Sequence, residues 1–159
     1  MIKSIVTNIK DLRKSCELVT KEDDIKSIVQ DLKDTLTNFS HKAIGLSANQ
    51  IGYNKRISYI RIPKDKNPET KMWNYNEYIL INAKILEKAR PVQVKNESCL
   101  SFPGVPVMTK RFVFVTVEYL DENMKIQTKM FQDLEGLCVQ HEIDHQNGIT
   151  IFDRKWRAK

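Results

Sequence analysis

The most informative stretch of the sequence lies near its C-terminal end and reads Gln140-His141-Glu142-Ile143-Asp144-His145. Residues four apart lie on one face of a helix, so His141 and His145 can direct their rings at a common point. Two such imidazoles supply two ligands of a metal site, and Glu142 is placed to act as a general base on water there. The plain alternative is a pair of partly buried helical histidines beside a glutamate. A third ligand decides between these interpretations.

That third ligand has to come from upstream of the helix. The fourteen residues after His145 contain no Glu, His or Cys, which disfavours the downstream glutamate ligand of thermolysin-like enzymes. Gly148 fits the start of the metzincin pattern, but Ile151 stands where that pattern requires its third histidine. Both protease patterns are therefore disfavoured.

Four upstream side chains offer a sulfur or imidazole donor: Cys16, His41, Cys99 and Cys138. Cys138 shares the helical face of the two histidines, but three ligands spread over nearly two turns are too far apart for a compact tetrahedron, and packing is its stronger interpretation. His41 follows a predicted helix and is typical of a helix end or a surface. Cys99 belongs to a strand-to-turn segment, residues 96–104, which can cross the helix and offer one thiolate.

Three segments, in this order along the chain, resemble the motifs of the peptide deformylase family. They are Ala43-Ile44-Gly45-Leu46-Ser47-Ala48-Asn49-Gln50, Glu97-Ser98-Cys99-Leu100-Ser101 and Gln140-His141-Glu142-Ile143-Asp144-His145. The family motifs read Gly-x-Gly-x-Ala-Ala-x-Gln, Glu-Gly-Cys-Leu-Ser and Gln-His-Glu-x-Asp-His, and the resemblance extends over about residues 11–154. The sequence departs from them at Ala43, Ser47 and Ser98. Ala43 and Ser98 add a Cβ near the expected substrate path, but no ligand or base is lost.

The resemblance implies a metal-dependent hydrolase that removes the formyl group from formyl-methionine of nascent polypeptides. Its expected metal ligands are Cys99, His141 and His145, with Glu142 as general base. A thiolate with two imidazoles suits Fe(II), Zn(II), Co(II) or Ni(II). The resemblance implies Fe(II) as the physiological ion, with Zn(II), Ni(II) or Co(II) able to substitute.

Further roles follow from the same resemblance. The Gln50 side chain and the Leu100 backbone N–H are expected to stabilise the oxyanion. Gly45 would let the substrate backbone approach closely, because it has no Cβ. The methionine pocket would be bordered by His141 and by Ile44, Leu137 and Cys138. Asp144 is expected to pair with a basic residue such as Arg111, the alternative being a plain surface charge.

Length and composition indicate a single catalytic domain over residues 1–159, with an ordinary hydrophobic fraction of 41%. No signal peptide is evident, and the longest apolar stretch, residues 112–117, is too short to span a bilayer. Three widely spaced cysteines do not form a disulfide framework, which favours a cytoplasmic location. We expect a monomer and no membrane association.

The net charge of +6 allows weak association with a ribosome surface, but the scattered lysines favour a solvated surface and no specific nucleic-acid binding. The chain ends at Lys159, where most bacterial relatives continue into a further helix or tail. This ending indicates a short form of the family, of a kind that phages encode.

The hydrophobic pattern predicts an α+β fold in which antiparallel strands wrap around a central metal-binding helix, with one N-terminal helix. Residues 1–19 are expected to form an irregular arm, followed by a helix to about Phe39 that begins with a Thr20–Asp23 capping box. Strands are predicted at 57–62, 78–83, 91–94, 112–119 and 125–131, with loops at 44–52 and 63–76 and a hairpin turn at 121–123. Asp133 is the expected N-cap of the metal-binding helix and Gly148 its stop.

Two other functions remain open from the sequence. The helix motif alone is compatible with a metal-dependent endopeptidase of the HExxH type. The basic surface is compatible with a non-catalytic metalloprotein that associates with the ribosome.

Overall fold

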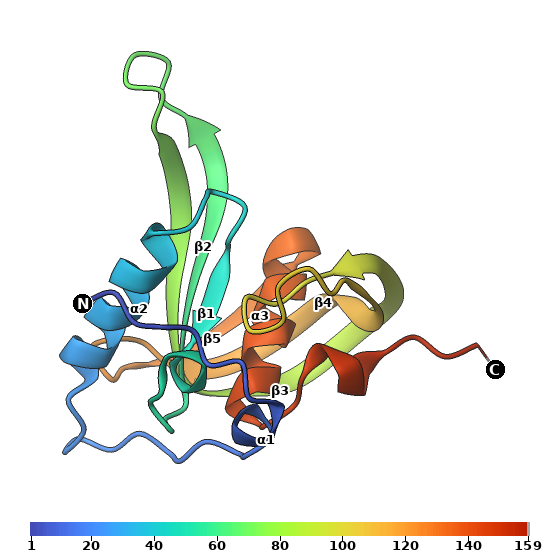
Figure 1. The fold of residues 1–159 in the computed structure, drawn as a ribbon, viewed down its shortest axis with the longest axis horizontal. Coiled ribbons are helices and arrows are strands. Elements are labelled where there is room, and N and C mark those ends of the chain that lie inside the picture. Colours follow the sequence, from blue (N-terminus) through green and yellow to red (C-terminus); the bar gives the residue numbers. More distant parts are fainter. Residues whose placement is uncertain (159) are drawn as a thin grey trace.

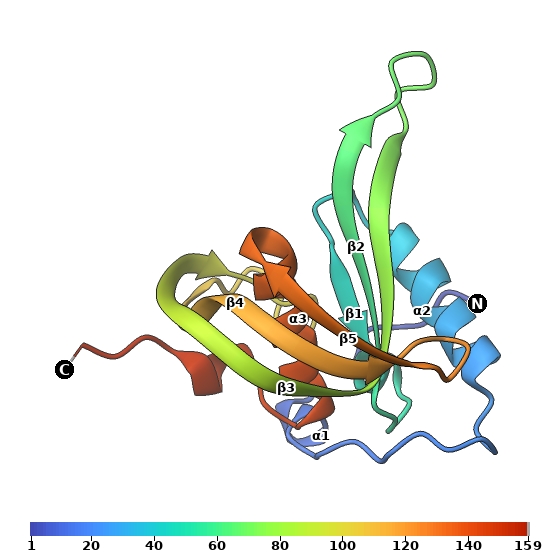
Figure 2. The same ribbon diagram turned by 180° about the vertical axis from the view of Figure 1, so that it is seen from behind.

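One antiparallel sheet forms the frame of the protein (Figures 1 and 2). The computed structural model describes residues 1–158. Within that range the sheet has five strands in chain order: β1 (Gly45–Ser47), β2 (Ile57–Lys66), β3 (Trp73–Glu97), β4 (Val107–Leu120) and β5 (Ile126–Gln132). Every neighbouring pair is antiparallel. The prediction of an α+β fold with antiparallel strands is therefore confirmed.

The part of the chain that the structure describes has three α-helices: α1 (Ile9–Leu12), α2 (Ile25–Thr37) and α3 (Asp133–Gln146). The expectation of one N-terminal helix after an irregular arm is wrong for α1, which begins where the Asn8 side chain accepts the backbone N–H of Lys10. A single turn is too short for hydrophobic periodicity to reveal it. The predicted cap of α2 is also wrong, because Asp24 accepts the Ser27 N–H at 3.2 Å.

Strand β3 is much longer than predicted. It joins the expected strands at 78–83 and 91–94 and extends beyond both. Register shifts interrupt its pairing with β4 at three places, and two of them lie between Ile81 and Glu87, where the first predicted strand ends. The alternation of polar and apolar residues is lost at such irregularities, so the sequence shows two strands where the chain forms one.

The loop predicted at residues 63–76 is mostly strand. The ends of β2 and β3 pair there as a hairpin that projects from the body of the protein (Figure 1). Pro63 is tolerated because β2 pairs with β1 only as far as Ile60, which leaves one side of the strand open. Trp73 stacks on His41 with ring centroids 4.9 Å apart, so this aromatic side chain packs against the segment that connects α2 to β1.

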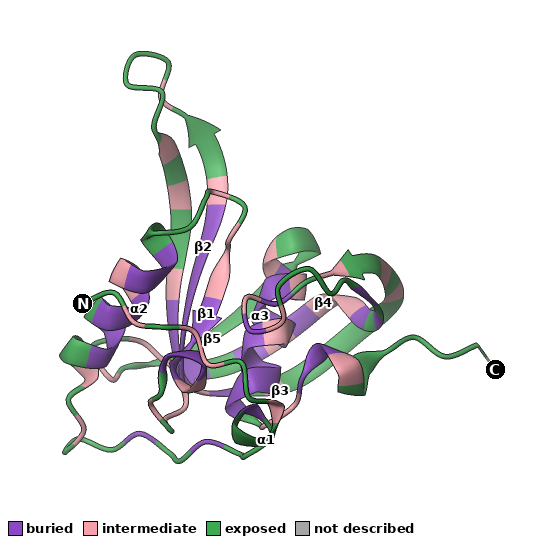
Figure 3. Cartoon of the chain, viewed as in Figure 1, coloured by how far each residue is buried: buried purple, intermediate pink, exposed green. Residues whose placement is uncertain are grey.

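Two hydrophobic clusters fill the interior. The first lies between α2 and the β1–β3 part of the sheet and includes the fully buried Leu32 and Leu36. The second packs α3 against strands β2 to β5 through residues such as Val117, Phe131 and Ile143. Helix α3 contacts all five strands and is buried along most of its length (Figure 3).

Helix α3 begins one residue away from the predicted start and ends where predicted. Gln132 is the N-cap residue, and Asp133 is the first helical residue with φ of 54°, so the prediction of Asp133 as cap is wrong by one position. Gly148 follows the helix with φ of 71°, which confirms the predicted stop. No helix among residues 1–158 is both long and apolar enough to cross a membrane.

Residues 44–52, predicted as a loop, contain β1 and a 3-10 helix over Ala48–Ile51. A strand of three residues is too short to show an alternating pattern. Because β1 is the outer strand of the sheet and lies against α3, this segment carries its side chains directly to the helix. The predicted turn at 121–123 is confirmed, and it connects β4 to β5.

Candidate metal centre

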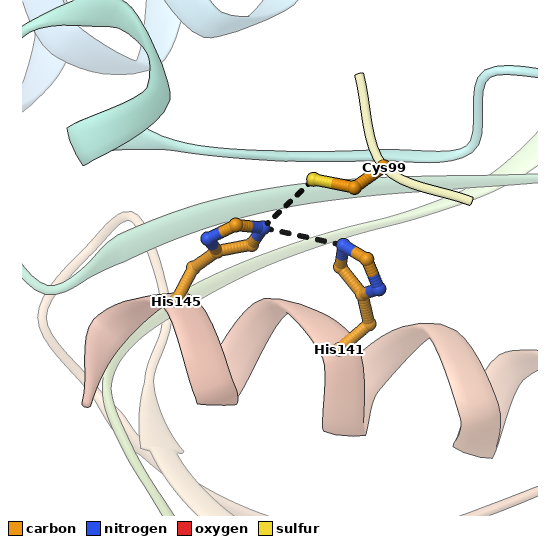
Figure 4. A group of neighbouring side chains, drawn as sticks. All are labelled: Cys99, His141 and His145. Carbon is orange, nitrogen blue, oxygen red and sulfur yellow. Dashed lines mark hydrogen bonds between the residues drawn. The ribbon is translucent and has the colours of Figure 1, made fainter. Parts of the chain in front are cut away.

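The side chains of Cys99, His141 and His145 meet at one point (Figure 4). Cys99 Sγ lies 3.4 Å from His145 Nε2, which lies 3.2 Å from His141 Nε2. Ligands on a tetrahedral ion, with sulfur at about 2.3 Å and nitrogen at about 2.0 Å, are separated by about 3.5 Å (S to N) and about 3.3 Å (N to N). The separations and the donor types therefore fit a single bound metal ion.

Two distant segments bring these side chains together. The histidines stand one turn apart on α3, as their spacing predicts. Cys99 comes two residues after β3 ends at Glu97, where the chain turns and the Phe102 N–H bonds to the Cys99 carbonyl at 3.0 Å. Cys99 is buried in a small hydrophobic cluster with Val107 and Ile151, which fixes the turn over the helix.

Glu97 orients the His141 ring, a role that the sequence motif did not reveal. Its Oε2 accepts from His141 Nδ1 at 2.9 Å and from Arg111 Nη2 at 2.6 Å. Burial opposes ionisation of Glu97, but the hydrogen bonds from Arg111 and His141 outweigh it and hold its pKa far below the usual range. Since an ionised carboxylate only accepts, His141 donates from Nδ1, which leaves Nε2 as the ring nitrogen that faces the candidate metal site.

Asp144 anchors α3 beside the face that carries the two histidines. It forms an ion pair with Arg111, which confirms the predicted partner, and a second one with Arg154 at 2.9 Å. Arg111 thus bridges Glu97 and Asp144 and ties β4 to the metal-binding face of the helix. The pairing with Arg154 was not expected from sequence, because nothing local links the end of the chain to this helix.

Glu142 is buried beside the three-residue group. Its Oε1 lies 3.9 Å from His141 Nε2, and its Oε2 accepts from Ser47 Oγ at 2.6 Å. Burial raises the pKa of Glu142, against the opposing effects of His141 and Ser47. A carboxylate with a raised pKa, held close to the group, has the position and basicity of a proton acceptor.

The structure shows a steric reason for glycine at position 45 that differs from the expected approach of the substrate backbone. A Cβ at this position would lie 2.7 Å from Glu142 Oε1 and 3.0 Å from Cys138 Sγ. The close neighbour that demands glycine is therefore the Glu142 carboxylate, on the chain's own helix.

Gln50 lies next to Cys99, buried in the 3-10 helix that follows β1. Its Oε1 accepts the Ser47 N–H at 2.9 Å, which fixes the orientation of the amide. Its Nε2 points to the site, 3.5 Å from Cys99 Sγ and 3.1 Å from Ser101 Oγ. Gln50 thus presents an oriented N–H donor next to the group of Cys99, His141 and His145.

A cavity of about 500 Å³ opens beside the group. It is bordered by all the expected pocket and oxyanion residues: Ile44, Gly45, Gln50, Leu100, Leu137, Cys138, His141 and Glu142. Burial raises the pKa of the Cys138 thiol well above its usual value, and its Sγ lies 3.7 Å from the Ile44 carbonyl. Cys138 packs against the cavity wall and is not part of the three-residue group, as expected from its spacing.

A Cys/His/His group with a buried glutamate, built on one helix and one crossing strand end, defines a metal-dependent hydrolase of the HExxH class. The model of the family described as "Polypeptide deformylase" matches residues 2–159. The chain belongs to this family of enzymes.

Relatives and solved structures agree with this assignment. The chain is 40% identical over 144 residues to "Peptide deformylase 1" of Nostoc sp., covering 90% of this chain and 73% of the relative. It is 34% identical to "Peptide deformylase" of Aquifex aeolicus, covering 100% and 92%. The crystal structure of peptide deformylase from Ehrlichia chaffeensis matches with a TM-score of 0.84 at 33% identity, covering 99% of this chain and 89% of that one.

Proposed function

We propose that this chain is a peptide deformylase, which hydrolyses the formyl amide of formyl-methionine at the N-terminus of nascent polypeptides and releases formate. The observation that carries the proposal is the convergence of Cys99, His141 and His145 next to the buried Glu142. Membership of the polypeptide deformylase family over residues 2–159 gives the reaction. In this proposal α3 is the metal-binding helix at the centre of a single catalytic domain.

Fe(II) is the proposed physiological ion, and Zn(II), Ni(II) and Co(II) are proposed substitutes, because one thiolate and two imidazoles accept all four. The ion, when bound, supplies the Lewis acidity that activates water for attack on an amide carbonyl. Cys99, His141 and His145 would hold it. Glu97 keeps the His141 ring in the orientation and tautomer that this requires.

The protein side chains move the proton and stabilise the developing charge. Glu142 takes the proton of the attacking water and passes it to the leaving amine. The Gln50 Nε2–H and the Leu100 backbone N–H donate to the oxyanion that forms at the formyl group. Gln50 is suited to this because its amide is already oriented by Ser47 and needs no reorganisation.

The cavity supplies the binding site for the methionine side chain. Ile44, Leu137 and Cys138 give it an apolar wall next to Gly45 and Glu142. We propose that the methionine side chain packs against this wall while the formyl group lies next to Glu142. The scissile amide bond then lies beside Cys99, His141 and His145. The formyl group is small, so it fits where the carbonyl of a longer acyl chain would not.

The proposal includes the cellular compartment and the assembly state. All three cysteines, Cys16, Cys99 and Cys138, are free and buried, which supports a reducing compartment such as the cytoplasm. A monomer that meets its nascent substrates at the ribosome through weak electrostatic attraction agrees with the net charge of +6.

The proposal is tested by measuring formate release from formyl-Met peptides with anaerobically purified, Fe(II)-loaded protein. Turnover is expected, and Glu142→Ala should lower kcat by about 10²- to 10⁴-fold. Equal activity of the two proteins would refute it. Cleavage of internal bonds in an unformylated peptide would indicate an endopeptidase instead, and a full metal load without turnover would indicate a non-catalytic metalloprotein.

A further inference from the structure

We infer that Ser47 is a positioning residue for the general base: its hydroxyl holds the Glu142 carboxylate in one orientation. The inference rests on the proposed function and concerns a position where this sequence carries serine in place of the alanine of the family motif. Ser47 is 1% exposed and ends β1, directly across from α3.

The contact between Ser47 and Glu142 is short and sheltered from water. Ser47 Oγ lies 2.6 Å from Glu142 Oε2 and 3.2 Å from the Glu142 backbone carbonyl oxygen. Both side chains are buried, at 1% and 3% exposure. A hydroxyl that donates to an ionised carboxylate forms a stronger bond than one between neutral groups, and burial removes competing water.

A chain of buried hydrogen bonds leads through Ser58 to Ser47 and the Glu142 carboxylate. The backbone N–H of Ala83, which can only donate, bonds to Gln146 Oε1 at 3.1 Å and so fixes the Gln146 amide. Gln146 Nε2 then donates to Ser58 Oγ at 2.9 Å. Ser58 Oγ lies 2.7 Å from Ser47 Oγ and 3.4 Å from the Glu142 carbonyl oxygen. Because an ionised Glu142 carboxylate only accepts, Ser47 donates its single proton to it, and the bond between the two serines is then donated by Ser58.

The two serines occupy one cross-strand pair, since Ser47 of β1 lies opposite Ser58 of β2. Both face α3, and Gln146 lies one turn beyond Glu142 on that helix. The series of hydrogen bonds therefore connects the sheet to the helix, and every residue in it is buried. Bonds arranged in this way polarise one another, and the last acceptor is the proposed base.

In this arrangement the two oxygens of the Glu142 carboxylate have different roles. Oε2 is occupied by Ser47, whereas Oε1 is the oxygen that faces the His141 side, at 3.9 Å from Nε2. A glutamate has several rotatable bonds, and Gly45 confines the carboxylate by contact alone. The Ser47 hydrogen bond supplies the directional restraint that keeps Oε1 ready to accept a proton.

The test compares Ser47→Ala with Ser47→Thr, which keeps the hydroxyl, in formate release by the metal-loaded enzyme. We expect Ser47→Ala to lower kcat by about 10- to 150-fold with KM within about twofold, as for loss of a hydrogen bond to a charged group. Ser47→Thr should retain most of kcat. Ser58→Ala should lower kcat less than Ser47→Ala, because it removes only the polarising donor.

Three measurements separate positioning from a structural role. Thr35→Ala also loses a buried hydroxyl, one that accepts the Lys3 N–H at 2.9 Å far from the site, and should leave kcat unchanged. Metal content should be unaltered in Ser47→Ala. In a Glu142→Gln background, Ser47→Ala should cause no further loss, because the base on which it acts is gone.

The outcomes distinguish this inference from the function on which it rests. A wild-type protein without formate release would overturn both. A wild-type protein with turnover, together with a Ser47→Ala variant whose kcat is within twofold of it, would overturn the inference alone. A Ser47→Ala loss that is just as large in the Glu142→Gln background would also overturn it. Should Ser47→Thr fail to fold, the Ser47→Ala and Ser58→Ala variants decide by the same criteria.

Discussion

Replacing Gly45 by alanine tests how tightly the proposed base is confined. The added Cβ would lie 2.7 Å from Glu142 Oε1, about 0.7 Å short of the 3.4 Å at which ordinary contact begins. It would also lie 2.9 Å from Glu142 Cδ and 3.0 Å from Cys138 Sγ, so it would overlap both the carboxylate and the neighbouring thiol. Glu142 must therefore move or rotate, and its bond to Ser47 must lengthen.

A displacement of this size is large for a catalytic group. Misplacement by 1 Å can lower a rate by about 10²-fold, so we expect kcat for formate release to fall by about 10- to 100-fold in Gly45→Ala. Overpacking should also reduce the free energy of unfolding by about 1–3 kcal/mol. Steady-state formate release and urea unfolding measure the two effects.

Gly52→Ala is the matched control. Gly52 has φ of 92° and no atom within 4 Å of an added Cβ, so alanine there strains the backbone without touching the site. It should lower the free energy of unfolding by about 1–2 kcal/mol and leave kcat unchanged. A Gly45→Ala enzyme with wild-type kcat would refute the view that contact with Gly45 confines Glu142.

Three further changes probe the supports of the site and the fold. Glu97→Gln removes the charge that orients His141 and should weaken metal affinity by about 10- to 100-fold in chelator competition, and wild-type affinity would contradict this. Leu32→Ala empties a fully buried position far from the site, so it should lower the free energy of unfolding by about 2–5 kcal/mol with unchanged kcat. The Lys125 N–H lowers the pKa of Asp121, so this stabilisation is present above about pH 4 and lost as the pH falls through the folded-state pKa. Asp121→Asn should therefore lose less stability than wild type between pH 7 and pH 3 in denaturant titrations, and equal losses would contradict the assignment.

The metal centre could be predicted from the sequence because the patterns that indicate it are local. The spacing of His141 and His145 places both rings on one helical face whatever surrounds the helix. Cys99 could be chosen because it alone lies in a turn segment able to cross that helix, and the family motifs pointed to the same residue. In the structure the candidate ligand atoms of Cys99, His141 and His145 lie within 4.8 Å of one another.

Apart from the pairing of Asp144 with Arg111, the contacts that support the centre could not be predicted, because they join residues distant in sequence. Glu97 and His141 are separated by 44 positions and Ser47 and Glu142 by 95, and neither pair has a local pattern. The same holds for Arg154 and its bonds to Asp144. Such pairs depend on the register of the strands and the rotation of α3, which only the packed structure determines.

The errors in the fold also have physical causes. Strand β3 was expected as two strands because its bulges interrupt the alternation of polar and apolar residues. The short elements α1 and β1 contain too few residues for any period to emerge. The strongly periodic α2 and the buried α3 were located correctly, since long elements average over local exceptions.

Metal content is the most direct test of the proposed ligand set. Protein purified without oxygen and analysed by plasma mass spectrometry is expected to hold one ion per chain in the wild type and nearly one in Cys138→Ala. Cys99→Ala should hold almost none, because two imidazoles alone bind weakly. A full load in Cys99→Ala together with an empty Cys138→Ala would contradict the assignment of Cys99 as the third ligand.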